Sequence, residues 1–176
     1  MLRVISITGF VVIALSSSAS AGPNGFSTGP RISEFGPAAK VVDATDIPAS
    51  AVFKIAFDVA DAAPAGERNR QLESVARLLN MHAKAGLAPE RTHAAVVVHG
   101  SAAMDLVSDA RYGSENASAG LIAALIEAGV SIQLCGQTAA FRGIVADDLL
   151  PGVTMSLSAM TAHAMLQQDG FTLNPF

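Results

Sequence analysis

The side chain in this sequence best suited to covalent chemistry is Cys135, the only cysteine among 176 residues. It follows a run from Val130 to Leu134 whose alternation of apolar and polar residues predicts a β-strand. Residues 137–141 are predicted to open a helix. A thiol at such a junction lies where parallel sheets bind ligands, and free backbone N–H groups there stabilise its thiolate. Cys135 is therefore either a reactive nucleophile or, like many free cysteines, a buried and inert apolar group.

Polar side chains at the other predicted strand ends should share this edge with the thiol. The carboxyl ends of neighbouring parallel strands meet at one edge of a sheet, so their loops face a common crevice. We expect Asp58, which precedes the end of the first core strand, to face this crevice as well. The candidate pocket residues around Cys135 are His99, Ser101, Asn116, Gly136, Gln137, Arg142 and His163.

Each charged or titratable candidate has a functional and a structural interpretation. Arg142 follows the thiol closely in sequence and would add positive charge beside it. His99 is either a base or hydrogen-bond donor that lowers the thiol pKa, or a histidine bonded to the backbone. His163 either faces the pocket or lies on the surface of the last helix, and Asn116 is expected to point toward the same edge.

Several other kinds of site are not indicated by the sequence. One cysteine and four histidines without ligand spacing predict no metal site. The G-x-S-x-G motif of serine hydrolases is absent, and no glycine-rich phosphate fingerprint follows the first core strand, so no cofactor is expected. The net charge of −4, without a basic patch, argues against nucleic acid as a partner. His82 and His93 are interpreted as surface or structural residues.

Strand and helix patterns alternate along the chain, which predicts βαβ units and a parallel sheet with helices on both faces. Gly86, Gly129 and Gly170 follow the three longer helices, as expected for helix C-termini. Ser158 is the predicted N-cap of the last helix. The predicted strands span residues 53–59, 93–99, 130–134 and 153–157, with a marginal edge strand at 171–176. The predicted helices span residues 70–85, 117–128 and 159–169, with a short helix or turn at 102–107.

The first 50 residues differ in composition from the rest. Arg3, an apolar run and the small residues Ala19-Ser20-Ala21 predict a signal peptide at 1–21, cleaved after Ala21, and export to the periplasm. The alternative is an uncleaved N-terminal anchor, but the apolar run is short for a permanent one. Residues 22–50 are rich in Gly, Pro, Ser and Ala and predict an extended arm, either disordered or lying across a neighbouring subunit. Residues 51–176 are predicted to form one α/β domain.

The run from 130 to 143 resembles the DsrE/DsrF-like family of small sulfur-relay proteins, which includes the TusD-related proteins of a tRNA thiolation relay. The similarity extends from about residue 53 to the C-terminus, and is best at 93–101, 116–143 and 149–176. It implies a flavodoxin-like three-layer α/β domain, with a mainly parallel sheet of 4–5 strands and helices on both faces. It also implies a homo-oligomer, a trimer or hexamer.

In relay members of this family, the cysteine that matches Cys135 carries a persulfide, so the resemblance implies a sulfur carrier. The predicted signal peptide departs from the cytoplasmic relays of the family and would make this carrier an exported one. Export would exclude tRNA thiolation, and it leaves the sulfur donor and acceptor unidentified. The alternative is a non-catalytic binding or assembly protein on the same fold, in which Cys135 is structural. The reactivity of the thiol separates the two hypotheses.

Overall fold

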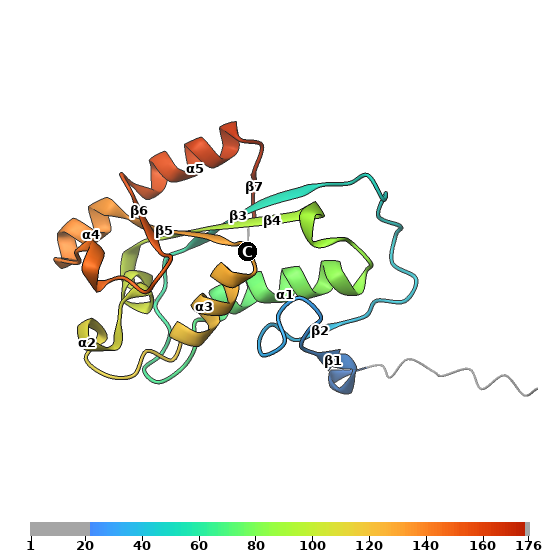
Figure 1. Cartoon of the computed structure of the whole chain (residues 1–176), viewed down its shortest axis with the longest axis horizontal. Helices are drawn as coiled ribbons and strands as arrows, with labels where there is room; N and C mark the ends of the chain where they lie inside the picture. Colours follow the sequence, from blue (N-terminus) through green and yellow to red (C-terminus); the bar gives the residue numbers. More distant parts are fainter. Residues whose placement is uncertain (1–21, 175–176) are drawn as a thin grey trace, which may run out of the picture.

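The computed structural model describes residues 22–174, so the predicted signal peptide lies outside the described residues. Its centre is a five-stranded parallel sheet with the strand order β6-β5-β4-β3-β7 (Figure 1). The strands are β3 (Phe53–Val59), β4 (Thr92–Val98), β5 (Ser131–Cys135), β6 (Thr154–Ser156) and β7 (Thr172–Leu173). The predicted marginal edge strand at the C-terminus is thus present, paired with β3.

Helices cover both faces of the sheet, as predicted. Helices α1 (Arg70–Lys84) and α3 (Ala119–Glu127) lie on one face, and α5 (Ala159–Gln168) lies on the other (Figure 1). The fold is therefore a flavodoxin-like three-layer α/β domain. Shorter helices at the rim are α2 (Asp109–Tyr112), α4 (Gly136–Arg142), η1 (Pro23–Gly25), η2 (Pro89–Arg91), η3 (Gly100–Leu106) and η4 (Ala146–Asp148). Within residues 22–174, no helix is both long and apolar enough to cross a membrane.

The central strands have the sequences expected for strands that are covered on both sides. All but one residue of β4 are buried, because Ala and Val side chains face helices above and below the sheet. In the register, Val59 lies opposite Val98, and Val98 lies opposite Leu134. The three strands therefore end at the same level, which brings the residues that follow them to one edge.

Side-chain caps fix where α1 and α5 begin. The Asn69 side chain accepts hydrogen bonds from the backbone N–H groups of Gln71 and Leu72 at the start of α1. The predicted N-cap Ser158 accepts one from Thr161 at the start of α5, at 3.0 Å. Such caps satisfy N–H groups that have no partner inside the helix.

The arm differs from the prediction, because residues 26–39 pack against their own chain. β1 (Phe26–Ser27) and β2 (Ala38–Ala39) form an antiparallel pair, and Ile32 and Phe35 enter the main core. Asn80 on α1, fully buried, explains the attachment. Its amide group accepts from the N–H of Ile32 at 2.8 Å and donates to three carbonyl groups of the arm.

The arm is fastened at the amino edge of the sheet, opposite the edge where the central strands end. The Arg31 guanidinium donates to the carbonyls of Pro89 and Ala128, at 3.0 and 2.8 Å. Pro89 precedes β4 and Ala128 precedes β5. Residues 40–50 remain exposed and carry no helix or strand.

Candidate functional site

Cys135 is the last residue of β5 and the N-cap of α4, as predicted. Leu134 points into the large core under α1 and α3, so Cys135 points to the opposite face, toward α5. The residue is 6% exposed. Gly136 allows α4 to start close to the end of β6, since a Cβ atom there would lie 2.5 Å from the carbonyl oxygen of Ser156.

Two helix N-termini meet at the sulfur. Desolvation is the largest influence on the pKa of Cys135 and raises it, but this is outweighed by hydrogen-bonding groups that favour the thiolate. These are the backbone N–H and hydroxyl of Thr138 and the N–H groups of Ala159 and Gln137. The pKa therefore lies below its ordinary value, although the neutral thiol makes no capping hydrogen bond.

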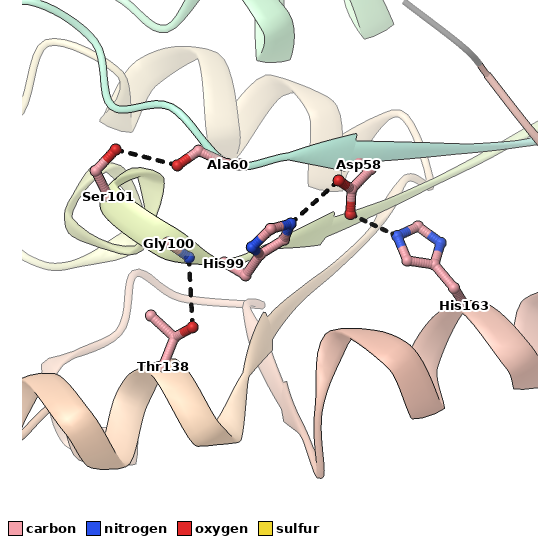
Figure 2. Close-up of polar contacts among 7 residues, drawn as sticks. All are labelled: Asp58, Ala60, His99, Gly100, Ser101, Thr138 and His163. Carbon is pink, nitrogen blue, oxygen red and sulfur yellow. Dashed lines mark hydrogen bonds and ion pairs between the residues drawn. The ribbon is translucent and has the colours of Figure 1, made fainter.

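Thr138 links the thiol to the neighbouring strand, and sequence reasoning missed it. Its Oγ1 accepts the N–H of Gly100, at 3.3 Å, so its hydroxyl proton is left for the sulfur (Figure 2). Only its place in the first turn of the helix after Cys135 could have indicated this role. Threonine is otherwise common on helix surfaces.

The second feature of the edge is a carboxylate held by two imidazoles. Asp58 Oδ2 lies 3.1 Å from His99 Nε2, and Asp58 Oδ1 lies 2.7 Å from His163 Nε2 (Figure 2). Desolvation raises the pKa of Asp58, but the hydrogen bonds and charges of the two histidines outweigh it and lower the pKa. The Asp58 side chain is 40% exposed, so water screens part of this interaction.

The strand register brings this cluster to the thiol. His99 and Cys135 follow the paired residues Val98 and Leu134, so they occupy neighbouring positions on the same face of the sheet. Helix α5 packs over this face of the sheet and contacts both the thiol and the cluster. Its Ala159 N–H stabilises the thiolate, and His163, one turn later, bonds to Asp58. The predicted crevice residues Asp58, His99, Cys135 and His163 therefore share one edge and one face.

Arg142, in contrast, does not take the predicted position beside the thiol. Its Nε donates to the carbonyl oxygen of Gly100, at 2.9 Å, and the low pKa of Cys135 comes from hydrogen-bonding groups instead. Arg142 ends the seven-residue helix α4, about two turns from the thiol at its N-terminus, so its guanidinium reaches the neighbouring loop more easily than the thiol. Arg142 therefore ties α4 to η3.

Two further candidates hold loops at the same edge. Ser101 Oγ donates to the carbonyl of Ala60 at 3.1 Å and accepts from Ala62 N–H at 2.9 Å, which fixes the loop after β3 (Figure 2). Gln137 is exposed, and its Nε2 donates to the Leu157 carbonyl, at 3.4 Å. Their side chains shape the rim of the site.

The expectation for Asn116 is wrong, because its amide group is buried and engaged by the backbone. It donates to the carbonyls of Asp105 and Val107, at 2.9 and 2.8 Å, and accepts from Ser118 N–H. Asparagine at the start of a helix caps the chain as readily as it binds a ligand. Asn116 belongs to a polar network that fixes η3 against α3. Among the described residues, no group of three or more His, Cys, Asp or Glu is arranged to hold a metal ion.

The fold and the site together define a class: a flavodoxin-like α/β domain with a thiol of lowered pKa at the carboxyl edge of its parallel sheet. The chain belongs to the DsrE/DsrF-like family, whose family model matches residues 52–175. This membership indicates a role related to sulfur relay. A comparison with curated proteins gives no match.

Solved structures show the same fold. A protein of unknown function from Methanobacterium thermoautotrophicum, MTH1491, is 23% identical with a TM-score of 0.52, over 69% of this chain and 97% of that chain. The ychN protein from E. coli is 16% identical with a TM-score of 0.52, over the same shares of the two chains.

Proposed function

We propose that this protein is a periplasmic sulfur carrier in which Cys135 accepts a sulfane sulfur as a persulfide and passes it to an acceptor. The observation that carries the proposal is the lowered pKa of Cys135, caused by N–H groups from the starts of α4 and α5 and by Thr138. The thiolate is the nucleophilic form of cysteine, so more of the protein is ready to react at neutral pH. Family membership supports sulfur as the group transferred.

The rim of the site supports transfer between proteins. Phe141, Leu157 and Met160 are 89%, 71% and 81% exposed, and they lie on α4, before α5 and on α5. Exposed apolar side chains grouped on neighbouring elements are typical of protein-binding surfaces. A donor or acceptor protein seated there would exclude water from a persulfide at Cys135.

Mass spectrometry of the native protein tests the proposal directly. After incubation with a persulfide donor, Cys135 should carry one added sulfur atom, and the variant Cys135→Ser should carry none. Equal sulfur uptake by the serine variant would refute the proposal.

A non-catalytic binding protein is the second candidate function, because Cys135 is only 6% exposed. In that case, the thiol would be inert and its alkylation slow at every pH below its ordinary pKa of 9.0. Alkylation that is already fast near neutral pH would exclude this candidate.

The proposal includes export and self-assembly. The signal-peptide pattern at Ala19 to Ala21 supports a mature chain that begins at Gly22, which N-terminal sequencing of the exported protein tests. We expect a homo-oligomer, a trimer or hexamer, as the family resemblance implies. A monomer mass by light scattering at micromolar concentration would contradict that expectation.

A further inference from the structure

The cluster of Asp58, His99 and His163 has a defined hydrogen-bond polarity. Ionised Asp58 can only accept hydrogen bonds, and each of its oxygens faces the Nε2 of one imidazole. Both Nε2 atoms therefore carry hydrogen. The nitrogen that remains to exchange a proton in each ring is Nδ1, since the partner of one ring nitrogen sets the state of the other.

The two histidines differ in what surrounds Nδ1. In His163 this atom is buried and has no hydrogen-bond partner among residues 22–174. Neither water nor a substrate reaches this atom, so His163 contributes a hydrogen bond to Asp58 through Nε2 and is not the ring that exchanges a proton. The His99 side chain is 33% exposed, twice the 16% of His163. Water or a substrate can therefore reach His99 and exchange a proton with it.

We propose that His99 is the proton donor to the thiolate that departs when Cys135 takes a sulfane sulfur, and that Asp58 and His163 are positioning residues that fix its ring. The proposal rests on the sulfur-carrier function and adds the acid that such a transfer uses. The register supports it, because His99 and Cys135 are neighbours on adjacent strands. Asp58, on the next strand, holds the ring from the other side.

The step balances with a persulfide as the donor. The Cys135 thiolate attacks the outer sulfur of R–S–S–H, a new S–S bond forms, and the old S–S bond breaks with its electron pair on R–S⁻. The imidazolium of His99 gives its Nδ1 proton to R–S⁻, which leaves as R–SH. Cys135 then carries S–SH and His99 is neutral. Water returns the proton to His99 before the next cycle.

The charged groups around His99 fit this role. Asp58 from β3 is negative and stabilises the imidazolium of His99, and His163 from α5 donates to the other oxygen of Asp58. Cys135 from β5 is negative as the thiolate, and Arg142 from α4 is held at a backbone carbonyl. The transfer rate should rise with pH as Cys135 ionises, because the thiolate is the form that attacks the persulfide.

The test measures the reaction of two reagents with Cys135, in the purified native protein and in the variant His99→Gln. The Nε2 of the glutamine can still donate to Asp58. Glutathione persulfide releases a basic thiolate that needs a proton. The aromatic disulfide of nitrothiobenzoate releases a weakly basic thiolate, which leaves without needing a proton. We expect His99→Gln to slow sulfur transfer from the persulfide by about 10²-fold and to leave the aromatic disulfide reaction nearly unchanged.

The outcomes separate the proton-donor role of His99 from the sulfur-carrier function of Cys135. Unchanged persulfide transfer in His99→Gln, or equal slowing of both reactions, would overturn the role as a proton donor. If the wild-type protein reacts with the aromatic disulfide but takes no sulfur from the persulfide, the sulfur-carrier function itself fails. The matched control is His93→Asn, an exposed histidine outside the cluster, which should leave both rates unchanged.

The positioning roles have their own test. His163→Leu removes the donor to Asp58, whereas the Nε2 of His163→Gln can replace it. We expect the leucine variant to lose part of the persulfide rate while keeping the aromatic disulfide rate, and the glutamine variant to restore the persulfide rate. Asp58→Asn should act like the leucine variant. Equal behaviour of His163→Leu and His163→Gln would refute the positioning role.

Discussion

On the face of the sheet covered by α1 and α3, the buried side chains are mostly large and aliphatic, such as Leu72, Leu121 and Ile122. The face under α5 is different. Its buried cluster consists of Ala56, Ala95, Val97, Ala162 and Leu166, and polar side chains occupy the rest of that face near the edge. Small residues bring α5 close to the sheet but bury little apolar area. One face of the sheet therefore buries most of the apolar area that stabilises the fold, and the other face carries the candidate functional site.

A core substitution on each face gives the largest contrast. Leu121→Ala on α3 should lower the free energy of unfolding by about 3–5 kcal/mol, because the leucine is fully buried. Leu166→Ala on α5 should cost about 2 kcal/mol, since its site is at the margin of a small cluster. Urea denaturation measures both. A larger cost for Leu166→Ala would contradict the comparison, and exposed Met160→Ala serves as the control.

Loss of one hydroxyl should change reactivity while leaving most of the stability intact. Thr138→Val removes a donor to the thiolate, so the pKa of Cys135 should rise and alkylation at neutral pH should slow by about tenfold. Thr138→Ser keeps the hydroxyl and should react like the wild-type protein. The measurement is the pH dependence of alkylation, and the same profile for valine and wild type would show that Thr138 has no such role.

Loss of the cap of α5 should affect both stability and thiol reactivity. Ser158→Ala removes the acceptor for Thr161 N–H and should cost about 1 kcal/mol by urea denaturation. It should also slow alkylation of Cys135, because the Ala159 N–H at the sulfur belongs to the same turn. Ser158→Thr keeps the cap. A stability loss with no change in thiol reactivity would separate the helix start from the site.

The smallest expected effect concerns stability in acid. The pKa of Asp58 is lowered below its ordinary value of 3.8, so its contribution is present above that value and is lost as the pH falls through the folded-state pKa. Asp58→Asn should therefore be less stable than wild type at neutral pH, with a difference that shrinks below pH 3.8. A difference that stays constant with pH would show that the charge is not involved.

The central sheet could be predicted from sequence because its strands are apolar runs that end at turn residues. Phe53–Val59 was predicted with its observed bounds, and the third strand was displaced by one residue. The four-residue helix α2 was missed, since one turn carries no periodic signal. The packing of the arm was missed for a similar reason. Ile32 and Phe35 stand alone among Gly, Pro and Ser, and the polar Asn80 in an otherwise apolar stripe was the available clue.

The site was predictable where strand ends determine it and unpredictable where side-chain direction does. The parallel sheet alone places Asp58, His99 and Cys135 at one edge. The contact of His163 with Asp58 depends on how α5 crosses the sheet, which local sequence does not specify. Arg142 and Asn116 were misjudged because both side chains bond to nearby backbone carbonyls, a partner available at almost any position.

The arm also fixes how the molecule is presented to its surroundings. Arg31 and Lys84 hold it at the end of α1 and the amino edge of the sheet, far from α4 (Figure 1). A linker, label or solid support attached ahead of Gly22 would therefore leave Cys135 facing outward. In immobilised molecules, soluble sulfur donors should still reach Cys135. The N-terminal end is therefore the suitable attachment point for capturing sulfur-transfer partners.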